Sequence, residues 1–294
     1  MLYFPIHSPV EEIKHELFEK KKVHVFIKRD DLIHPFISGN KWRKLKYILA
    51  DARSLDKNHI VTFGGAFSNH LLATACAGAK FGFKTTGIVR GEKHDRLNNT
   101  LFLCEQFGMD LQYVDREEYR RKEEIFEAIF GNDDQAYFIP EGGSSTLAMP
   151  GCGELVEELG ETFDHIFLAC GTGATMAGIT QSVHTKKLKT LVEGIAVLKG
   201  ADFLENDIRK LIGSDPRFKL HTNYHEGGYA KVNAEYLEWL KNFNASGLLL
   251  DHVYTGKMMR AVFDLIEHDY FKSGAKILTI HTGGLIGFLG LNQR

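Results

Sequence analysis

The sequence predicts an α/β protein built on a mainly parallel sheet with helices on both faces. Apolar runs alternate with segments of helical periodicity along almost the whole chain, which is the order found in doubly wound folds. The apolar runs are continuous instead of alternating with polar residues, as in strands that are buried on both faces. A chain of 294 residues is long enough for one large or two medium domains.

Each predicted element follows from its local pattern. The predicted strands are short apolar runs bounded by glycine, proline or charged residues: 23–28, 59–63, 85–89, 111–114, 137–140, 165–169, 191–197, 218–222 and 276–281. The predicted helices have longer periodic patterns: 41–53, 68–79, 97–108, 116–130, 150–160, 175–185, 201–212, 231–243 and 256–272. A chain divided into two domains would cross between them at the glycine-rich turns near 39–45 and 141–150.

Composition and charge exclude several classes of protein. A formal net charge of −2 gives no basic field for nucleic acid, and no apolar run reaches the length of a membrane span. Residues 1–5 do not form the basic and then apolar pattern of a secretory signal. The four cysteines are widely spaced and form no CxxC pair: Cys76, Cys104, Cys152 and Cys170. We therefore expect free thiols in a cytoplasmic protein without nucleic-acid or membrane partners.

Lys41 is the first candidate for chemistry. It follows Gly39 and Asn40, and the apolar residues after it recur at helical spacing, so it lies at a helix N-terminus. The positive end of a helix disfavours an ammonium ion, and a neutral amine is the form that imine chemistry needs. The alternative is that Lys41 is an ordinary solvated helix lysine.

A glycine-rich loop at 170–178 is the second candidate. It follows the apolar run 165–169, and its glycines allow backbone N–H groups to converge on an anion at the start of a helix. Thr172 and Thr175 add hydroxyl donors. Such loops also bind dinucleotides or only turn corners. No Gly-Lys-Ser/Thr sequence follows, and the strand ending at 197–199 lacks the acidic residue expected of an NAD site.

Three further stretches place polar residues at strand ends or helix starts. Residues 64–70 place Ser68 and Asn69 at a helix start, and 253–257 and 280–284 each contain a threonine. Taken singly, each stretch is explained equally well by helix capping or, at Tyr254, by a packed ring. His221 and His225 have helical spacing, but the flanking residues are typical of a strand and a turn, so we expect no metal site.

Together these stretches resemble one family. The sequences Gly-Asn-Lys-x-Arg-Lys, Gly-Gly-Ala-Phe-Ser-Asn-His, Gly-Thr-Gly-Ala-Thr, Val-Tyr-Thr-Gly-Lys and His-Thr-Gly-Gly occur in one order between Val25 and Gly284. This order is similar to that of the pyridoxal-phosphate enzymes containing D-cysteine desulfhydrase and 1-aminocyclopropane-1-carboxylate (ACC) deaminase. These enzymes belong to the tryptophan-synthase-β-like group of fold type II.

The resemblance implies a fold and an assembly. Its members have two doubly wound, mainly parallel sheets, with the smaller domain inserted in the larger. On this chain we place the large cofactor-binding domain at 1–44 and 146–294, and the small domain at 45–145. Members of the family are typically homodimers, so a homodimer is expected here as well.

The resemblance also implies roles for individual residues. Lys41 would hold pyridoxal 5'-phosphate covalently, and Lys41, Ser68 and Tyr254 would be the catalytic residues. Asn69 would contact the phenolate oxygen of the ring. The phosphate would be held by Lys44, Gly171, Thr172, Gly173, Ala174 and Thr175. Thr255 and Thr282 would lie on the side of the pyridine nitrogen. The substrate, a small amino acid, would contact Asn40, Ser68, Asn69, His70, Tyr229 and Tyr254.

Two positions bear on the choice of substrate. ACC deaminases of the family have glutamate and leucine where this chain has Thr255 and Thr282, and in both places this chain resembles the D-cysteine desulfhydrases. A neutral threonine makes the cofactor ring a weaker electron sink, which suits β-elimination. We therefore expect a lyase that converts D-cysteine to pyruvate, ammonia and sulfide, with the final ammonia released by hydrolysis. ACC deaminase is the alternative, and a non-catalytic phosphate- or nucleotide-binding protein is the alternative of another class.

Overall fold

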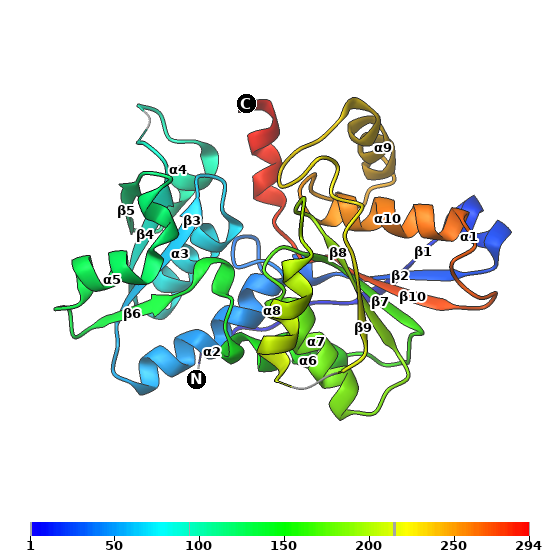
Figure 1. Ribbon diagram of the computed structural model, residues 1–294, viewed down its shortest axis with the longest axis horizontal. Helices are drawn as coiled ribbons and strands as arrows, with labels where there is room; N and C mark the ends of the chain where they lie inside the picture. The colour runs from blue at the N-terminus through cyan, green and yellow to red at the C-terminus, as the bar shows by residue number, and fades with distance from the viewer. Residues whose placement is uncertain (1, 94, 214–215, 294) are drawn as a thin grey trace.

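A computed structural model, which describes residues 2–93, 95–213 and 216–293, contains two α/β units side by side (Figure 1). The larger unit is built on a six-stranded sheet in the order β1-β2-β10-β7-β8-β9. β1 is antiparallel to β2, and all the other pairs are parallel. The strands are β1 (Val10–Ile13), β2 (His24–Lys28), β7 (His165–Cys170), β8 (Leu191–Ala196), β9 (Phe218–His221) and β10 (Lys276–Ile280). The predicted fold class is confirmed.

The smaller unit is built on a four-stranded sheet in the order β5-β4-β3-β6, with every pair parallel. Its strands are β3 (His59–Gly65), β4 (Lys84–Arg90), β5 (Met109–Val114) and β6 (Ala136–Ile139). The larger sheet uses residues from both sides of this segment, so the smaller sheet is inserted in the chain of the larger one. This is the arrangement that the family resemblance implies.

Helices cover both faces of the larger sheet. One core contains side chains of α1 (Glu16–Lys21), α9 (Ala234–Asn244) and α10 (Thr255–Glu267), and a second core on the other face contains those of α6 (Met149–Glu157), α7 (Ala174–Thr185) and α8 (Phe203–Ile212). Buried strand residues such as Phe167 and Leu168 point to opposite faces and belong to different cores. The continuous apolar strands are thus explained by burial on both sides.

The smaller sheet is covered in the same way. α3 (Asn69–Phe81) and α4 (Asn99–Gln106) share a core with β4 and β5, while α5 (Lys122–Phe130) packs over β3 and β4 on the other side. α2 (Asn40–Ser54) packs against α3 and also against α6 of the larger unit. None of the helices in the described part of the chain is long and apolar enough to cross a membrane.

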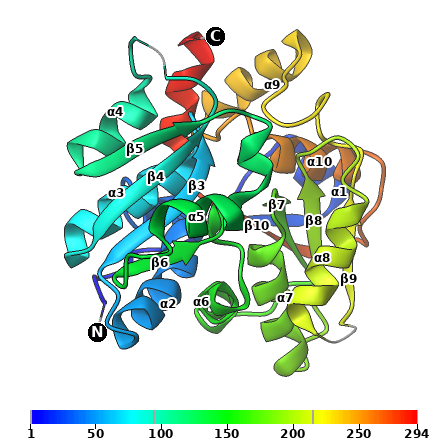
Figure 2. The same ribbon diagram turned by 60° about the vertical axis from the view of Figure 1, so that its left-hand side comes forward.

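The structure adds elements that the sequence pattern did not predict. β1 and α1 are short, with four and six residues, so neither shows a full period of its pattern. The helix predicted at 116–130 is a 3₁₀ turn, η2 (Glu118–Arg120), followed by α5. The other 3₁₀ segments are η1 (Asp30–Leu32), η3 (Glu141–Gly143), η4 (Thr146–Ala148) and η5 (Leu285–Gln293). Both views show η5 beside α4 (Figures 1 and 2).

The domain limits at 44/45 and 145/146 stay a prediction. The first limit falls inside α2, which is one continuous helix from Asn40 to Ser54 and contacts both units. The second falls between η3 and η4, in the segment that returns the chain to α6. α2 therefore joins the two units as a shared element.

The first turn of α2 is anchored by a buried cluster of charges. Arg43 donates from Nε to Asp30 Oδ2 at 2.5 Å and from Nη2 to Asp30 Oδ1 at 2.7 Å. The same guanidinium donates to both carboxylate oxygens of Glu158, each at 2.9 Å. Lys28 forms a second ion pair with Glu158 at 2.7 Å, and Ser8 Oγ donates to Asp30 at 2.6 Å. Arg43 and Asp30 are each only 1% exposed, so this pair has almost no contact with water.

The cluster fixes where α2 begins. Its members come from residues before β1, from β2, η1 and α2, and from the residue that follows α6. A guanidinium that holds two carboxylates in bidentate geometry allows little rotation or translation of its helix. Lys41 and Lys44 flank Arg43 in sequence, so the cluster determines the position of both lysines.

We predict that Asp30→Asn lowers the free energy of unfolding by about 3–5 kcal/mol, because it leaves a buried guanidinium with one uncompensated charge. Urea unfolding of the purified protein measures this loss. Glu161→Gln is the control, since its ion pair with Lys276 is exposed and contributes at most about 1 kcal/mol. Equal losses in the two variants would contradict the anchoring role.

Candidate active site

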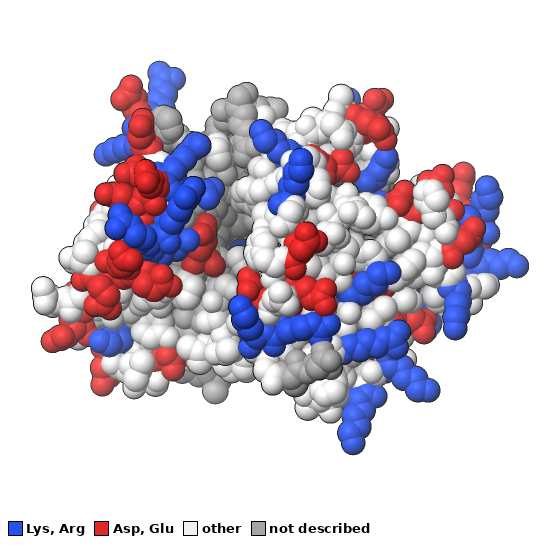
Figure 3. All heavy atoms as spheres, in the orientation of Figure 1, with Lys and Arg blue, Asp and Glu red and all other residues white. Residues whose placement is uncertain are grey.

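A large cavity of about 1960 Å³ lies between the two units. It opens where parallel strands of both sheets end, with residues of 65–70, 89–92 and 169–173 on its wall. Ligands of open α/β sheets bind at this edge. Figure 3 shows charged side chains of both signs crowded on the outer face of the smaller unit beside the opening. This face therefore has no field of one sign beside the opening.

Lys41 lies on the cavity wall in the first turn of α2. The preceding Gly39 has φ +57°, and a Cβ atom there would lie 1.9 Å from the carbonyl oxygen of Thr282. Only glycine permits this approach, which brings the start of α2 against the end of β10. Burial, assisted by the nearby charge of Lys44, lowers the pKa of Lys41 to about 7. A large part of Lys41 is therefore neutral and nucleophilic at physiological pH.

Lys44 and His70 lie beside Lys41 on the same wall. Lys44 Nζ donates to the carbonyl oxygen of Gly142 at 3.0 Å, and burial lowers the pKa of this ammonium. Burial and the two lysines lower the pKa of His70 well below its ordinary value, so the imidazole is neutral. The cavity wall thus brings together three basic side chains, those of Lys41, Lys44 and His70, whose capacity for hydrogen bonds is only partly used within the described part of the chain.

The tautomer of His70 follows from its hydrogen bonds. Thr62 Oγ1 donates its one hydrogen to the carbonyl oxygen of Ile139 at 2.8 Å, so His70 Nε2 must donate to Thr62 at 2.9 Å. Nδ1 of His70 is then an acceptor. This atom is buried and has no hydrogen-bond partner among the described residues. Such an orphaned acceptor beside two lysines indicates a site built for a ligand group.

The glycine-rich loop has the form of an anion site. Gly171, Thr172, Gly173 and Thr175 line the cavity, and Gly173 adopts φ +79° immediately before α7 begins at Ala174. The first backbone N–H groups of α7 have no partner within the helix. Asn40 Nδ2 donates to Thr175 Oγ1 at 3.0 Å, so the hydroxyl of Thr175 can still act as a donor itself. The side chain of Ala174 itself is buried.

Ser68 and Asn69 occupy the start of α3. Ser68 Oγ accepts from the backbone N–H of Leu71 at 3.2 Å, so the capping role is present. Ser68 also lines the cavity, where its hydroxyl hydrogen can still donate. A Cβ atom on Gly284 would lie 2.4 Å from Asn69 Nδ2, which shows how closely the chain entering η5 packs on this amide.

Tyr229 and Tyr254 form a pair on the larger unit's side of the cavity. The hydroxyl of Tyr254 donates to that of Tyr229 at 3.3 Å, and the two rings meet edge to face at 6.0 Å. A Cβ atom on Gly171 would lie 3.3 Å from Cε1 of Tyr254, so this ring lies on the anion loop. Burial raises the pKa of Tyr254 well above its ordinary value, and the hydroxyl remains a proton donor at neutral pH.

The two threonines that bear on substrate choice lie in different places. Thr282 is on the cavity wall, at the end of β10. Thr255 is fully buried and is not on the wall: its hydroxyl donates to Asp251 Oδ1 at 2.7 Å and accepts from the backbone N–H of Asp251 at 2.9 Å. Thr255 therefore closes the turn before α10, and its predicted place on the side of the pyridine nitrogen stays a prediction.

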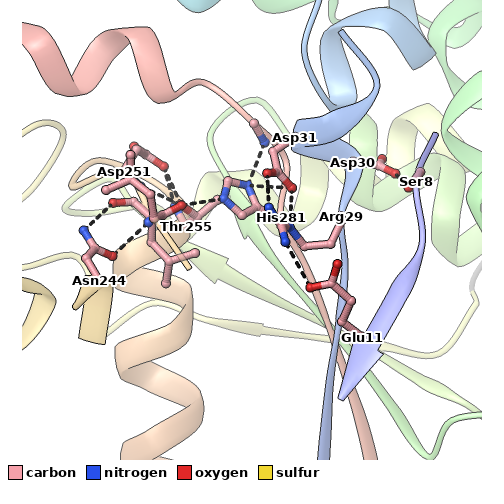
Figure 4. A network of polar contacts seen from close by, with 12 residues as sticks. Ser8, Glu11, Arg29, Asp30, Asp31, Asn244, Asp251, Thr255 and His281 are labelled. Carbon is pink, nitrogen blue, oxygen red and sulfur yellow. Dashed lines mark hydrogen bonds and ion pairs between the residues drawn. The ribbon is translucent and has the colours of Figure 1, made fainter. Parts of the chain in front are cut away.

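Asp251 is a site residue that the sequence did not indicate. Its carboxylate accepts from Thr255 Oγ1 and from the backbone N–H groups of Val253, Tyr254 and Thr255 at 2.7–2.9 Å. Figure 4 shows Asp251 and Thr255 on one side of His281, with Asp31 and Arg29 on the other. The available signal was an aspartate at the start of a helical pattern. That signal predicts a cap and says nothing about a cavity.

A second group missed by the sequence lies on the smaller unit. Tyr119 is buried beneath the cations of Arg90 and Lys122, which lie 5.6 and 4.8 Å from the centre of its ring. Lys122 forms an ion pair with Glu141 at 3.3 Å, and all four residues line the cavity. These residues belong to different elements, so no local pattern connects them.

Comparison with known proteins agrees with this geometry. A family model described as "Pyridoxal-phosphate dependent enzyme" matches residues 8–283. A Thermotoga maritima protein named as a candidate 1-aminocyclopropane-1-carboxylate deaminase is 33% identical, over 98% of this chain and 96% of its own. The mitochondrial bifunctional D-cysteine desulfhydrase/1-aminocyclopropane-1-carboxylate deaminase of Arabidopsis thaliana is 32% identical, over 90% of this chain and 73% of its own.

A solved structure described as an ACC deaminase homologue superposes with a TM-score of 0.83 and is 30% identical, covering 98% of this chain and 93% of that one. The fold is that of an α/β enzyme, and the chain belongs to the pyridoxal-phosphate dependent enzyme family. The predicted cofactor and the predicted enzyme class are confirmed.

The residues present fit this cofactor. Lys41 supplies an amine with a pKa of about 7, and the loop before α7 supplies hydroxyls and unpaired N–H groups for a phosphate. The buried acceptor on His70 and the hydroxyl of Thr282 provide further polar contacts for a ligand. The individual roles of these residues stay a prediction. In the described part of the chain, no group of three or more His, Cys, Asp or Glu side chains is placed to hold a metal ion.

We predict that Thr172→Ala and Thr175→Ala each weaken cofactor binding about tenfold or more while the fold is kept. Each hydroxyl would donate to a charged phosphate, a bond worth about 1.5–3 kcal/mol. Equilibrium dialysis against pyridoxal phosphate measures the affinity. Thr185→Ala, at the exposed far end of α7, is the matched control. Unchanged affinity in the Thr172/Thr175 double variant would reject the phosphate role of the loop.

Proposed function

We propose that this enzyme catalyses β-elimination from a small amino acid, converting D-cysteine to pyruvate, ammonia and sulfide. The observation that carries the proposal is the position of Thr282, a neutral hydroxyl residue on the cavity wall where ACC deaminases of the family have leucine. The name of the Arabidopsis relative, which contains both activities, supports either substrate.

Lys41, Ser68 and Tyr254 each have a separate role in this reaction. Bound pyridoxal phosphate withdraws electrons from the α-carbon of an amino acid. Lys41, with a pKa of about 7, is matched to take the α-proton at neutral pH. Ser68 and the N-terminus of α3 hold the substrate carboxylate, since unpaired N–H groups favour an anion there. Tyr254 keeps its proton because burial raises its pKa, and its hydroxyl donates a hydrogen bond to the departing sulfur.

The lack of a carboxylate favours elimination over ring opening for an electrostatic reason. Where ACC deaminases of the family have glutamate, this chain has the neutral Thr255, which cannot hold the pyridine nitrogen protonated as a carboxylate can. The electron sink is then weaker. A β-substituent that leaves readily tolerates a weak sink, because charge on the α-carbon does not need to persist. Opening an unactivated cyclopropane requires more stabilisation.

Two alternatives remain from the sequence. ACC deaminase, giving 2-oxobutanoate and ammonia, is the runner-up, and both the Thermotoga relative and the solved homologue carry that name. The non-catalytic phosphate- or nucleotide-binding protein is set aside, because the chain belongs to an enzyme family and presents a neutral amine to its cavity.

We also propose that the enzyme is a cytoplasmic homodimer. The support for a reducing compartment is that all four cysteines are free and buried. The support for a dimer is the resemblance to a family whose members are typically dimeric. Light scattering of the holoenzyme distinguishes a mass near 66 kDa from the 33.2 kDa of one chain, the dimer being about twice the monomer mass.

We predict that the wild-type holoenzyme releases pyruvate and sulfide from D-cysteine, with a higher kcat/KM than it shows for ACC. Thr282→Leu should lower the D-cysteine value about tenfold, which is the cost of one hydrogen bond near 1.4 kcal/mol. Thr282→Ser, which keeps the hydroxyl, is the matched control and should stay within about threefold of wild type. A wild-type preference for ACC in parallel assays would show that the threonine argument is wrong.

A further inference from the structure

Lys257 is a buried cation in an unfavourable place. Its side chain is 0% exposed, and it lies in the first turn of α10, where the helix dipole disfavours positive charge. The charges of Glu226 and Asp251 act to raise its pKa, but the hydrogen bonds of its ammonium go to backbone carbonyls. Burial lowers the pKa of Lys257 to about 8. Burying an apolar side chain of similar length at this position would cost less free energy than burying an ammonium. We therefore expect the ammonium to have a role through its hydrogen bonds.

The ammonium of Lys257 binds two backbone carbonyls of one loop. Nζ donates to the carbonyl oxygen of His225 at 2.7 Å and to that of Gly228 at 2.8 Å. The same two carbonyls also accept from backbone N–H groups inside the loop, from Gly228 at 2.9 Å and from Lys231 at 3.1 Å. Lys257 therefore closes residues 225–231 into one hydrogen-bonded unit, which we call the 225–231 loop.

The 225–231 loop has a strained backbone. Glu226 and Ala230 adopt φ of +51° and +52°, in the left-handed region that costs a non-glycine residue about 1–2 kcal/mol. Gly227 and Gly228 also have positive φ, at +91° and +126°. A backbone of this kind persists only where contacts from the rest of the protein hold it. The two bonds from Lys257 are contacts of this type, and they come from a different element, α10.

The strained loop carries Tyr229 to the cavity. Tyr229 lies between Gly228 and Ala230, lines the cavity, and is 46% exposed, so its own packing does not fix it. Its hydroxyl accepts from Tyr254 at 3.3 Å. Tyr254 and Lys257 lie three residues apart in the chain, at the start of α10. One end of this helix therefore presents Tyr254 to the cavity and, through Lys257, holds the loop that presents Tyr229.

We propose that Lys257 is a positioning residue, which fixes Tyr229 against Tyr254 through the carbonyls of His225 and Gly228. The proposal rests on the proposed function in one respect: the loss of activity that it predicts requires Tyr254 to act on the substrate. The position of the loop itself can be measured without any reaction.

The test compares Lys257→Met, Tyr229→Phe and the double variant as holoenzymes. Methionine keeps the length and apolar character of the side chain and removes its donors. Hydrogen–deuterium exchange should be at least tenfold faster at the amides of Gly228 and Lys231 in Lys257→Met. Lys57→Met is the control, because Lys57 also donates to a backbone carbonyl, that of Asp134, but in the smaller unit. It should leave the exchange of both amides unchanged.

Kinetics separate a positioning role from a packing role. Lys257→Met should lower kcat/KM for the best amino-acid substrate at least tenfold in the wild-type background, and by less than threefold in the Tyr229→Phe background. Such non-additivity is expected if one residue acts through the other. Equal losses in both backgrounds, or unchanged exchange in the 225–231 loop, would overturn the proposal. If Lys257→Met does not fold, Lys257→Leu, which also removes the donors, is compared in its place with the same criteria.

The two proposals fail in different ways. A holoenzyme that converts none of the amino acids tested contradicts the proposed function, while faster exchange of the loop in Lys257→Met still supports the positioning role. Unchanged exchange in an active enzyme contradicts the positioning role alone.

Discussion

The buried bidentate pairing of Arg43 with Asp30 and Glu158 is the constraint on which the site depends. It ties the first turn of α2 to η1 and to the end of α6, and two further groups, Lys28 and Ser8, complete it. Burying so much charge is costly unless every partner is in place, so the arrangement tolerates only one position of the helix. The cluster sets the backbone positions of Lys41 and Lys44, which lie on either side of Arg43.

The same anchoring explains why the pKa of Lys41 is lowered. Lys41 is held where burial and the charge of Lys44 both oppose its protonation, and no carboxylate is among the causes that shift its pKa. Fixed geometry is needed for this, because a free lysine side chain would move its ammonium to water. Two contacts with backbone groups also help to position α2: Gly39 packs closely on Thr282, and the ammonium of Lys44 donates to the carbonyl oxygen of Gly142. Groups from both chain ends and from the inserted unit therefore meet at one place.

The sequence predicts much of this because the signals are local. The periodicity after Lys41, the glycines of 171–173 and the serine at the start of α3 each indicate an element boundary, and parallel sheets bring such boundaries to one edge. The order of the motifs then identifies the family. The sequence did not predict β1 and α1, because four and six residues are too few to show the hydrophobic period of a strand or a helix.

What the sequence misses depends on partners that are distant in the chain or in another element. Arg43 and Glu158 are 115 residues apart, and the ammonium of Lys257 reaches a carbonyl 32 residues away. The motif also did not indicate that the hydroxyl of Thr255 donates to the carboxylate of Asp251, four residues away. A motif shows which residue types are present, whereas the direction of a side chain is decided by which partner is closest.

The central claim is that the fold holds the amine of Lys41 neutral near physiological pH. The most direct test is trace labelling of the cofactor-free protein with an amine-reactive reagent across pH, with the rate at Lys41 read by peptide mass spectrometry. A lysine model peptide labelled in the same tube provides the reference, with a midpoint of about 10.4. The account predicts a midpoint for Lys41 near the pKa of about 7 given by its burial. A midpoint for Lys41 equal to that of the reference peptide would contradict it.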